Sequence, residues 1–229
     1  MTGRLFIVSF FAGLFFAAPL FSQGVPAATP SKDGSEKTNI RPTPTPVSVA
    51  EPFDKATVAA MAAKCVRLET EAGDIEAEMY PESAPETVRN FLNLVAIGAL
   101  DTTTFSRVVP GFVVQGGNIW TRTGGVMRDL GTRARRPLRD EPNRILHERG
   151  VLSMARGDEP NSATTNFFIL VSSGSHLDGI FAAFGRVTRG MEVVDTINKA
   201  SVTEEKPDKP VRIKKASVFS CEHPLNVPQ

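Results

Sequence analysis

Residues 105–117 combine side-chain types that could act together on a peptide. Apolar residues alternate after Phe105 and again after Gly111, and alternate side chains of a strand point to opposite faces of a sheet. Arg107, Phe112 and Gln115 would therefore meet on one open surface if the chain turns at the Pro-Gly pair, residues 110–111. A cation, an aromatic ring and an amide together suit an apolar ligand that carries carbonyl groups, and a peptide is such a ligand.

Short predicted β-strands must position residues 105–117. The first two runs alternate in polarity on either side of a Glu-Ala-Gly turn, which is the pattern of a hairpin. The expected strands are residues 65–70, 74–80, 105–109, 112–115, 151–154, 167–171, 182–187 and 211–219. Many short strands with few helices favour an all-β barrel or sandwich.

Two helices are expected among these strands. Apolar residues from Val88 to Val95 recur at helical spacing, and Ser83 with Glu86 predicts a capping box at the start of that helix. Residues 190–198 predict a second, shorter helix. Residues 53–63 could add a helical turn or two before the first strand.

Composition and charge exclude several classes of protein. The 229 residues include 26 Lys plus Arg and 25 Asp plus Glu, so the net charge is too small to favour binding to nucleic acid or acidic lipid. The 3 histidines share no ligand spacing, and the 2 cysteines are too far apart for a zinc knuckle. We therefore expect no metal and no cofactor. The length suits one domain with an attachment, or two very small domains.

The N-terminal residues differ from the rest of the chain. Arg4 precedes an apolar run over residues 5–18, which is shorter than the roughly 20 residues of a bilayer span. Residues 1–22 are therefore predicted to be a secretory signal peptide, and the protein to be periplasmic or secreted. An uncleaved single-pass anchor is the alternative. Residues 23–62 predict a Pro/Thr/Ser-rich linker, and beyond the signal segment we expect no membrane contact.

Residues 122–149 form an arginine-rich segment with eight arginines and four acidic residues. The segment could be a basic surface for acidic partners. It could also be a solvated loop in which arginines pair with the segment's own acids, and this is the favoured interpretation. Those acids are Asp129, Asp140, Glu141 and Glu148.

Three ordered blocks of the chain resemble the cyclophilins, the peptidyl-prolyl cis-trans isomerases. Residues 105–117 are similar to the family signature F-x-R-V-x-P-G-F-x-x-Q-G-G. The second block covers residues 150–156 and 161–169, and the third covers residues 176–179, 184–187 and 190–191. The resemblance runs in order over nearly all of residues 65–219.

The resemblance implies a mainly β fold, a closed eight-stranded antiparallel barrel with a helix at each end. Residues 63–223 would form this domain, followed by a tail at residues 224–229. The first and last strands lie close together in this family, which would place Cys65 near Cys221. In an oxidising compartment the two could form a disulfide, or they could be two separate buried thiols.

The resemblance also implies roles for individual residues. Arg107 would donate to the prolyl nitrogen, which regains a lone pair as the amide twists. Gln115 would bind a substrate carbonyl, Phe112 would help to form the slot for the proline ring, and the backbone at residues 155–156 would hold the peptide extended. The other expected substrate-binding residues are Val113, Ala155, Arg156, Asn166, Phe168, His176, Leu177 and Phe181.

Some residues depart from the family pattern. Asn166 stands where most members have Gln, and Phe181 where many have His. His176 occupies the position of a Trp in cyclosporin-sensitive members. The resemblance therefore implies weak cyclosporin binding.

The function predicted from the sequence is isomerisation of X-Pro bonds, assisting the folding of exported proteins. We expect a monomer that acts on proline-containing unfolded or extended polypeptides. The alternative is a cyclophilin-like module that binds proline segments without useful turnover. A Ser/His/Asp hydrolase built on His176 and Asp178 is disfavoured, because no G-x-S-x-G motif occurs.

Overall fold

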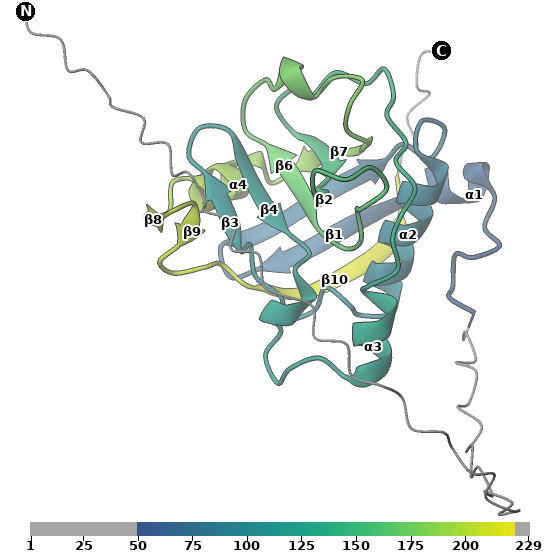
Figure 1. Ribbon diagram of the computed structural model, residues 1–229, viewed down its shortest axis with the longest axis horizontal. Helices are drawn as coiled ribbons and strands as arrows, with labels where there is room; N and C mark the ends of the chain where they lie inside the picture. The colour runs from purple at the N-terminus through teal and green to yellow at the C-terminus, as the bar shows by residue number, and fades with distance from the viewer. Residues whose placement is uncertain (1–49, 223–229) are drawn as a thin grey trace, which may run out of the picture. The chain divides into compact units, whose positions relative to one another are not determined.

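The computed structural model describes residues 50–222 (Figure 1). The predicted signal peptide, most of the predicted linker and the tail at 224–229 lie outside the described residues. The helices are α1 (Val58–Ala62), α2 (Pro85–Ala96), α3 (Arg128–Arg133) and α4 (Met191–Asn198), with 3₁₀ helices at Ile119–Thr121 and Ser175–Leu177. None of the helices within residues 50–222 has the length and apolar character that a bilayer span requires.

One antiparallel sheet of 8 strands dominates the structure. Its strands are β1 (Lys64–Thr70), β2 (Gly73–Met79), β3 (Arg107–Val109), β4 (Val113–Gly116), β5 (Val151–Met154), β6 (Phe167–Leu170), β7 (Ala183–Arg189) and β10 (Ile213–Ser220). A separate hairpin is formed by β8 (Val202–Thr203) and β9 (Lys206–Pro207). The mainly β, eight-stranded antiparallel prediction is confirmed.

The prediction of a closed barrel was wrong. The strand order is β10-β1-β2-β7-β5-β6-β4-β3, so β10 and β3 are edges, and within residues 50–222 the segments that precede these two strands meet at an isolated bridge between Thr104 and Arg212. Closure fails because the outer backbone of β3 has another partner. The N–H of Val108 donates to the carbonyl of Glu205, in the turn between β8 and β9, at 2.8 Å.

The core lies between the curved sheet and its helices. On the buried face of α2, Val88, Phe91 and Leu92 are fully inaccessible to solvent. The Phe91 ring packs 5.2 Å from that of Phe167 on β6 and 5.0 Å from that of Phe184 on β7. In the view of Figure 1, α2 and α4 lie at opposite ends of the curved sheet, and both helices pack into the same core. The structure adds α1, which the sequence suggested, and α3, which it did not.

The start of α2 is not capped as the sequence predicted. The N-cap residue is Ala84, and the Ser83–Glu86 capping box does not form. Instead, the carboxylate of Glu141 accepts hydrogen bonds from the N–H groups of Glu86 at 3.1 Å and Thr87 at 2.7 Å. A carboxylate from a distant loop therefore satisfies N–H groups that the first helical turn leaves unpaired.

Residues 50–62, which we assigned to the linker, belong to the folded domain. Met61 is fully buried, and Glu51 forms an ion pair with Arg133 of α3, each with a side chain about one-tenth exposed. The N–H of Phe53 donates to the side-chain carbonyl of Asn93 on α2 at 2.7 Å. The domain therefore starts earlier than residue 63, because this segment finds specific polar partners on two helices.

A disulfide joins Cys65 to Cys221, with the two Cα atoms 5.2 Å apart. It arises because β1 and β10 are antiparallel neighbours, with Lys64 opposite Ser220. Of the two states that the sequence left open, the structure contains the bridge rather than separate thiols.

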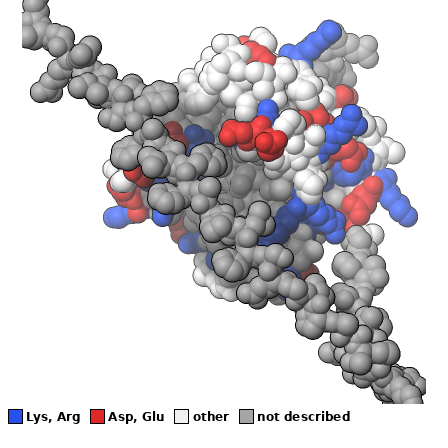
Figure 2. Space-filling view, viewed as in Figure 1, with Lys and Arg blue, Asp and Glu red and all other residues white. Residues whose placement is uncertain are grey.

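The arginine-rich segment is largely tied into the fold. Arg149 forms a bidentate pair with Asp195 on α4 at 2.7 Å, and Arg122 donates to backbone carbonyls after α2. The segment's own acids pair elsewhere: Asp140 with Arg156 and Glu148 with Arg186. The pairings expected within the segment were therefore wrong. Figure 2 shows basic and acidic side chains interspersed on the visible face.

Candidate active site

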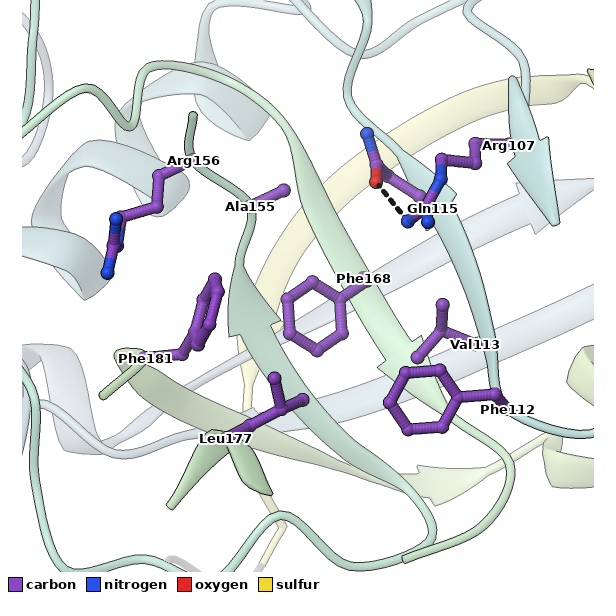
Figure 3. Close-up of a pocket in the computed structure, with 9 residues that line it drawn as sticks. All are labelled: Arg107, Phe112, Val113, Gln115, Ala155, Arg156, Phe168, Leu177 and Phe181. Atoms are coloured by element: carbon purple, nitrogen blue, oxygen red, sulfur yellow. Dashed lines mark hydrogen bonds between the residues drawn. The ribbon is translucent and has the colours of Figure 1, made fainter. Parts of the chain in front are cut away.

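A pocket of about 220 Å³ opens on the outer surface of the sheet beside β3, β4 and β6 (Figure 3). Its lining residues are Arg107, Phe112, Val113, Gln115, Ala155, Arg156, Phe168, Leu177 and Phe181. All of them are residues that the sequence assigned to catalysis or substrate binding. Figure 3 shows the guanidinium groups of Arg107 and Arg156 on opposite sides of the pocket, with the Phe168 ring between them and the Phe112 ring on the side of Arg107.

Strand register brings the polar and aromatic groups together. Arg107 on β3 lies directly opposite Gln115 on β4, and Gln115 lies opposite Phe168 on β6. Directly paired residues of an antiparallel sheet share a face. The cation, the amide and the ring therefore form one row across three neighbouring strands.

The β3–β4 turn is held by a residue that the sequence analysis missed. Asn198, at the end of α4, is only 6% exposed. Its side-chain amide donates to the carbonyls of Val109 at 2.9 Å and Val113 at 3.0 Å. Its carbonyl oxygen accepts from the N–H of Gly111 at 2.7 Å. Asn198 lies one helical turn after Val194, on the apolar face of its helix. A polar residue on the apolar face of a predicted helix was therefore the signal available in the sequence.

The floor of the pocket is apolar. Val113 and Phe168 are 2% and 6% exposed, whereas Phe112 is half-buried. The Phe168 and Phe181 rings meet edge to face, with centroids 6.1 Å apart. A floor of aromatic and aliphatic side chains favours a compact apolar group such as a proline ring.

Arg107 lies at the rim with its side chain 45% exposed. Its Nε donates to Glu205 Oε2 at 2.7 Å, and its Nη1 donates to Gln115 Oε1 at 3.4 Å. The second of these is the dashed line in Figure 3. Of the guanidinium nitrogens, Glu205 accepts a hydrogen bond only from Nε. The edge of the guanidinium that carries the two Nη atoms is therefore directed to the pocket side. The sequence contained no signal for Glu205, which lies 98 residues away along the chain.

Arg156 supports the opposite rim. Its guanidinium carbon lies 5.0 Å above the centre of the Phe181 ring, and its Nη1 donates to the carbonyls of Gly157 and Asp158. The N–H of Ala155 is already bonded to the carbonyl of Asn166 at 3.0 Å. This N–H is therefore engaged within the domain, and the contact of the backbone at 155–156 with an extended peptide stays a prediction.

Two of the expected substrate-binding residues do not line the pocket. The side-chain carbonyl oxygen of Asn166 is buried and has no hydrogen-bond partner within residues 50–222. His176 is exposed, and its ring lies against Phe112 with centroids 5.4 Å apart. His176 therefore contacts a lining ring without lining the pocket itself.

Ser153, His147 and Asp178 form a hydrogen-bonded Ser–His–Asp chain, whose histidine is not the one considered above. His147 Nδ1 is 3.0 Å from Asp178 Oδ1, and its Nε2 is 3.0 Å from Ser153 Oγ. The backbone N–H of His147, followed by its ring, hydrogen-bonds the Asp178 carboxylate and lowers the pKa of that group. Ser153 is fully buried and His147 is 1% exposed. No substrate can reach this serine, so the chain is structural and the hydrolase alternative fails.

Residues 65–218 match the family model "Cyclophilin type peptidyl-prolyl cis-trans isomerase/CLD". Peptidyl-prolyl cis-trans isomerase A of Dickeya dadantii is 37% identical over 166 residues, covering 67% of this chain and 84% of that protein. Peptidyl-prolyl cis-trans isomerase B of Bacillus subtilis is 40% identical over 132 residues, covering 57% and 87%.

The same likeness holds between structures. A crystal structure of a cyclophilin type peptidyl-prolyl cis-trans isomerase from Cryptosporidium parvum, in the presence of the dipeptide Ala-Pro, aligns with a TM-score of 0.60. It is 31% identical, and the alignment covers 69% of this chain and 99% of that one. With its signature residues gathered at one pocket, this chain belongs to the cyclophilin-type peptidyl-prolyl cis-trans isomerase family.

Proposed function

We propose that this protein, as a monomer, catalyses rotation about X-Pro bonds in unfolded or extended polypeptides. The observation that carries the proposal is the row of Arg107, Gln115 and Phe168 across three strands, above an apolar floor. The presence of Ala-Pro in the Cryptosporidium parvum structure supports a proline-containing ligand. Sedimentation as a single species with the mass of one chain is the expected result for the monomer.

The chemistry follows from the electronic structure of the amide. Resonance sets a rotational barrier of about 18–20 kcal/mol, and it is lost when the bond twists. The prolyl nitrogen then regains a lone pair and can accept a hydrogen bond. A guanidinium that donates to this nitrogen stabilises the twisted state more than the planar one, which lowers the barrier. Arg107 has its Nη edge on the pocket side and can make this contact.

The other lining residues hold the substrate while it turns. Phe112 and Phe168 would enclose the proline ring, so that one half of the amide is fixed. Gln115 would donate its side-chain amide to a substrate carbonyl, because its Oε1 already faces Arg107. The reaction makes and breaks no covalent bond, so no nucleophile or general base is required.

Substitution of Arg107 tests the function. In an assay with a short X-Pro peptide, Arg107→Ala should lower kcat/KM by about a hundredfold, the loss typical of removing a donor aimed at transition-state charge. Arg107→Lys should recover only part of it, because an ammonium lacks the planar fork. Arg67→Ala is the matched control: Arg67 is 40% exposed and likewise ion-paired, and its strand, β1, carries no residue that lines the pocket. Equal rates for wild type and Arg107→Ala would instead favour a proline-binding module.

We further propose that the protein is exported and assists the folding of other exported proteins. Proline isomerisation takes tens to hundreds of seconds unaided and limits the folding of many chains. The apolar run after Arg4 and the Cys65–Cys221 disulfide support this role, because disulfides persist in oxidising compartments. Fractionation of cells expressing the full chain should recover it outside the cytoplasm, and wholly cytoplasmic recovery would contradict the proposal.

Cyclosporin should bind weakly. The indole expected in cyclosporin-sensitive members is replaced by His176, whose smaller ring packs against Phe112. The site thus loses the large apolar body of an indole and its N–H donor. Titration should give a dissociation constant well above the nanomolar range, and His176→Trp should tighten binding. A nanomolar constant for the unmodified protein would refute this expectation.

A further inference from the structure

The hairpin of β8 and β9 turns through two residues in an unusual backbone conformation. Glu204 and Glu205 have φ values of 50° and 63°, both in the left-handed region. Turns of this kind favour Asn and Gly, because a Cβ is disfavoured there. Two glutamates at these positions strain the turn. Such strain persists only where contacts with the surrounding structure hold the backbone in place.

Those contacts come from the strand that carries Arg107. The carbonyl of Glu205 accepts from the N–H of Val108 at 2.8 Å, and its carboxylate accepts from Arg107 Nε at 2.7 Å. Glu205 therefore binds two consecutive residues of β3, one with its backbone and one with its side chain. Glu204 shares the turn and the backbone conformation, yet its carboxylate forms no ion pair within residues 50–222.

The carboxylate determines the direction of the catalytic guanidinium. Arg107 Nε is held by Glu205 and Nη1 by Gln115, so acceptors on two sides define the plane of the group. A half-exposed arginine without these partners would sample many rotamers. Because rate depends on the guanidinium being in place when the amide twists, loss of this order should slow the chemical step.

We propose that Glu205 is a positioning residue for Arg107, an inference that rests on the proposed isomerase function. Glu205 is not among the residues that line the pocket. It takes Nε and thereby directs the Nη edge of Arg107 toward the pocket. Both side chains are about half exposed, at 45% and 48%, so the effect should be moderate and weakened by salt.

The experiment compares Glu205→Ala, Glu205→Gln, Glu204→Ala and Arg107→Ala in the full chain. Glu205→Ala should lower kcat about fivefold with little change in KM, which is the upper end of what an exposed ion pair contributes. Glu205→Gln keeps an acceptor for Nε and should restore kcat to within about twofold of wild type. Glu204→Ala should match wild type. Thermal unfolding of each variant shows whether the hairpin substitutions disturb the fold.

A spectroscopic readout separates positioning from a structural role. The Nε–H signal of Arg107 in a proton–nitrogen correlation spectrum, assigned by its loss in Arg107→Lys, should shift in Glu205→Ala and stay unchanged in Glu204→Ala. The inference is overturned if Glu205→Ala keeps wild-type kcat, if Glu204→Ala loses as much, or if Glu205→Gln is no better than Glu205→Ala. If Arg107→Ala itself has no effect, the proposed function fails, which is a different result.

Discussion

At the scale of single residues, the structure keeps the charge of Arg107 at the surface. Its side chain is 45% exposed, so the guanidinium keeps much of its hydration and does not require a buried counter-charge. Exposed ion pairs contribute only about 0–1 kcal/mol to stability. The contacts of Arg107 with Glu205 and Gln115 therefore matter for geometry much more than for folding.

Tyr80, the single tyrosine of the chain, provides a test of pH dependence. Burial, followed by the charge of Glu78 and the hydrogen bond from the Tyr80 hydroxyl to that carboxylate at 2.9 Å, raises the pKa of Tyr80 well above its usual value. The unfolded chain loses this proton near its ordinary pKa of about 10, whereas the folded chain retains it. Folding stability should therefore decrease as pH rises above about 10, and tyrosinate absorbance should appear only together with unfolding.

The control for this titration is Glu78→Gln. Without the neighbouring negative charge, the Tyr80 phenol should ionise at lower pH than in the unmodified protein. Tyr80→Phe removes the signal and fixes the baseline. A wild-type titration midpoint near 10 with the fold intact would show that the burial and charge of this site do not act as described.

At the scale of elements, side chains from other parts of the chain hold the ends of strands and helices. Asn198 clamps the β3–β4 turn with three hydrogen bonds from α4, which places Phe112 over the pocket. Glu141 caps the start of α2 from the arginine-rich segment. In both cases the loop or turn is positioned by a polar group that is distant in sequence.

The cap of α2 can be tested with two substitutions. Glu141→Ala should lower the free energy of unfolding by about 1 kcal/mol, because two N–H groups of the first turn lose their acceptor and the helix dipole loses a favourable charge. Ser83→Ala is the matched control and should change little, since Ser83 makes no capping bond. Urea unfolding measures both. Equal losses for the two variants would mean that the serine caps the helix in solution.

At the scale of the whole molecule, the sheet is open between β3 and β10. A disulfide joins the strands that come first and last along the chain, β1 and β10, which are neighbours in the sheet. The Cys65–Cys221 bridge spans a sequence separation of 156 residues. In the chain-entropy model, closing a loop of this length restricts the unfolded state by up to about 5 kcal/mol. The pocket lies on β3, β4 and β6, away from the two cysteines.

Removal of the disulfide should therefore affect stability and spare catalysis. We expect reductant, or the double substitution Cys65→Ala with Cys221→Ala, to lower the free energy of unfolding by as much as about 5 kcal/mol. Isomerase activity of the folded protein should stay at the wild-type level. The double variant should not respond to reductant, which controls for other effects of the reagent. An unchanged urea midpoint on reduction would contradict the expectation.

The sequence by itself predicted the eight strands of the main sheet and the two main helices but not the β8–β9 hairpin, and its resemblance to the cyclophilins predicted the residues that line the pocket. Alternation, helical spacing and turn residues are local properties, so a stretch such as residues 105–117 contains the information for its own hairpin. Alternation along that hairpin predicted that Arg107, Phe112 and Gln115 share one surface, so these three could be identified without coordinates, whereas the lining residues outside it were predicted only from the family resemblance.

Only the tertiary structure decided which distant segments meet. Glu205 lies 98 residues from Arg107, and Asn198 lies 87 residues from Gly111. The open edge of the sheet, which the family likeness did not predict, has the same origin, because Val108 pairs with the β8–β9 turn and not with β10. Such contacts depend on how loops pack once the core has formed. They cannot be predicted from the spacing of residues in the local sequence.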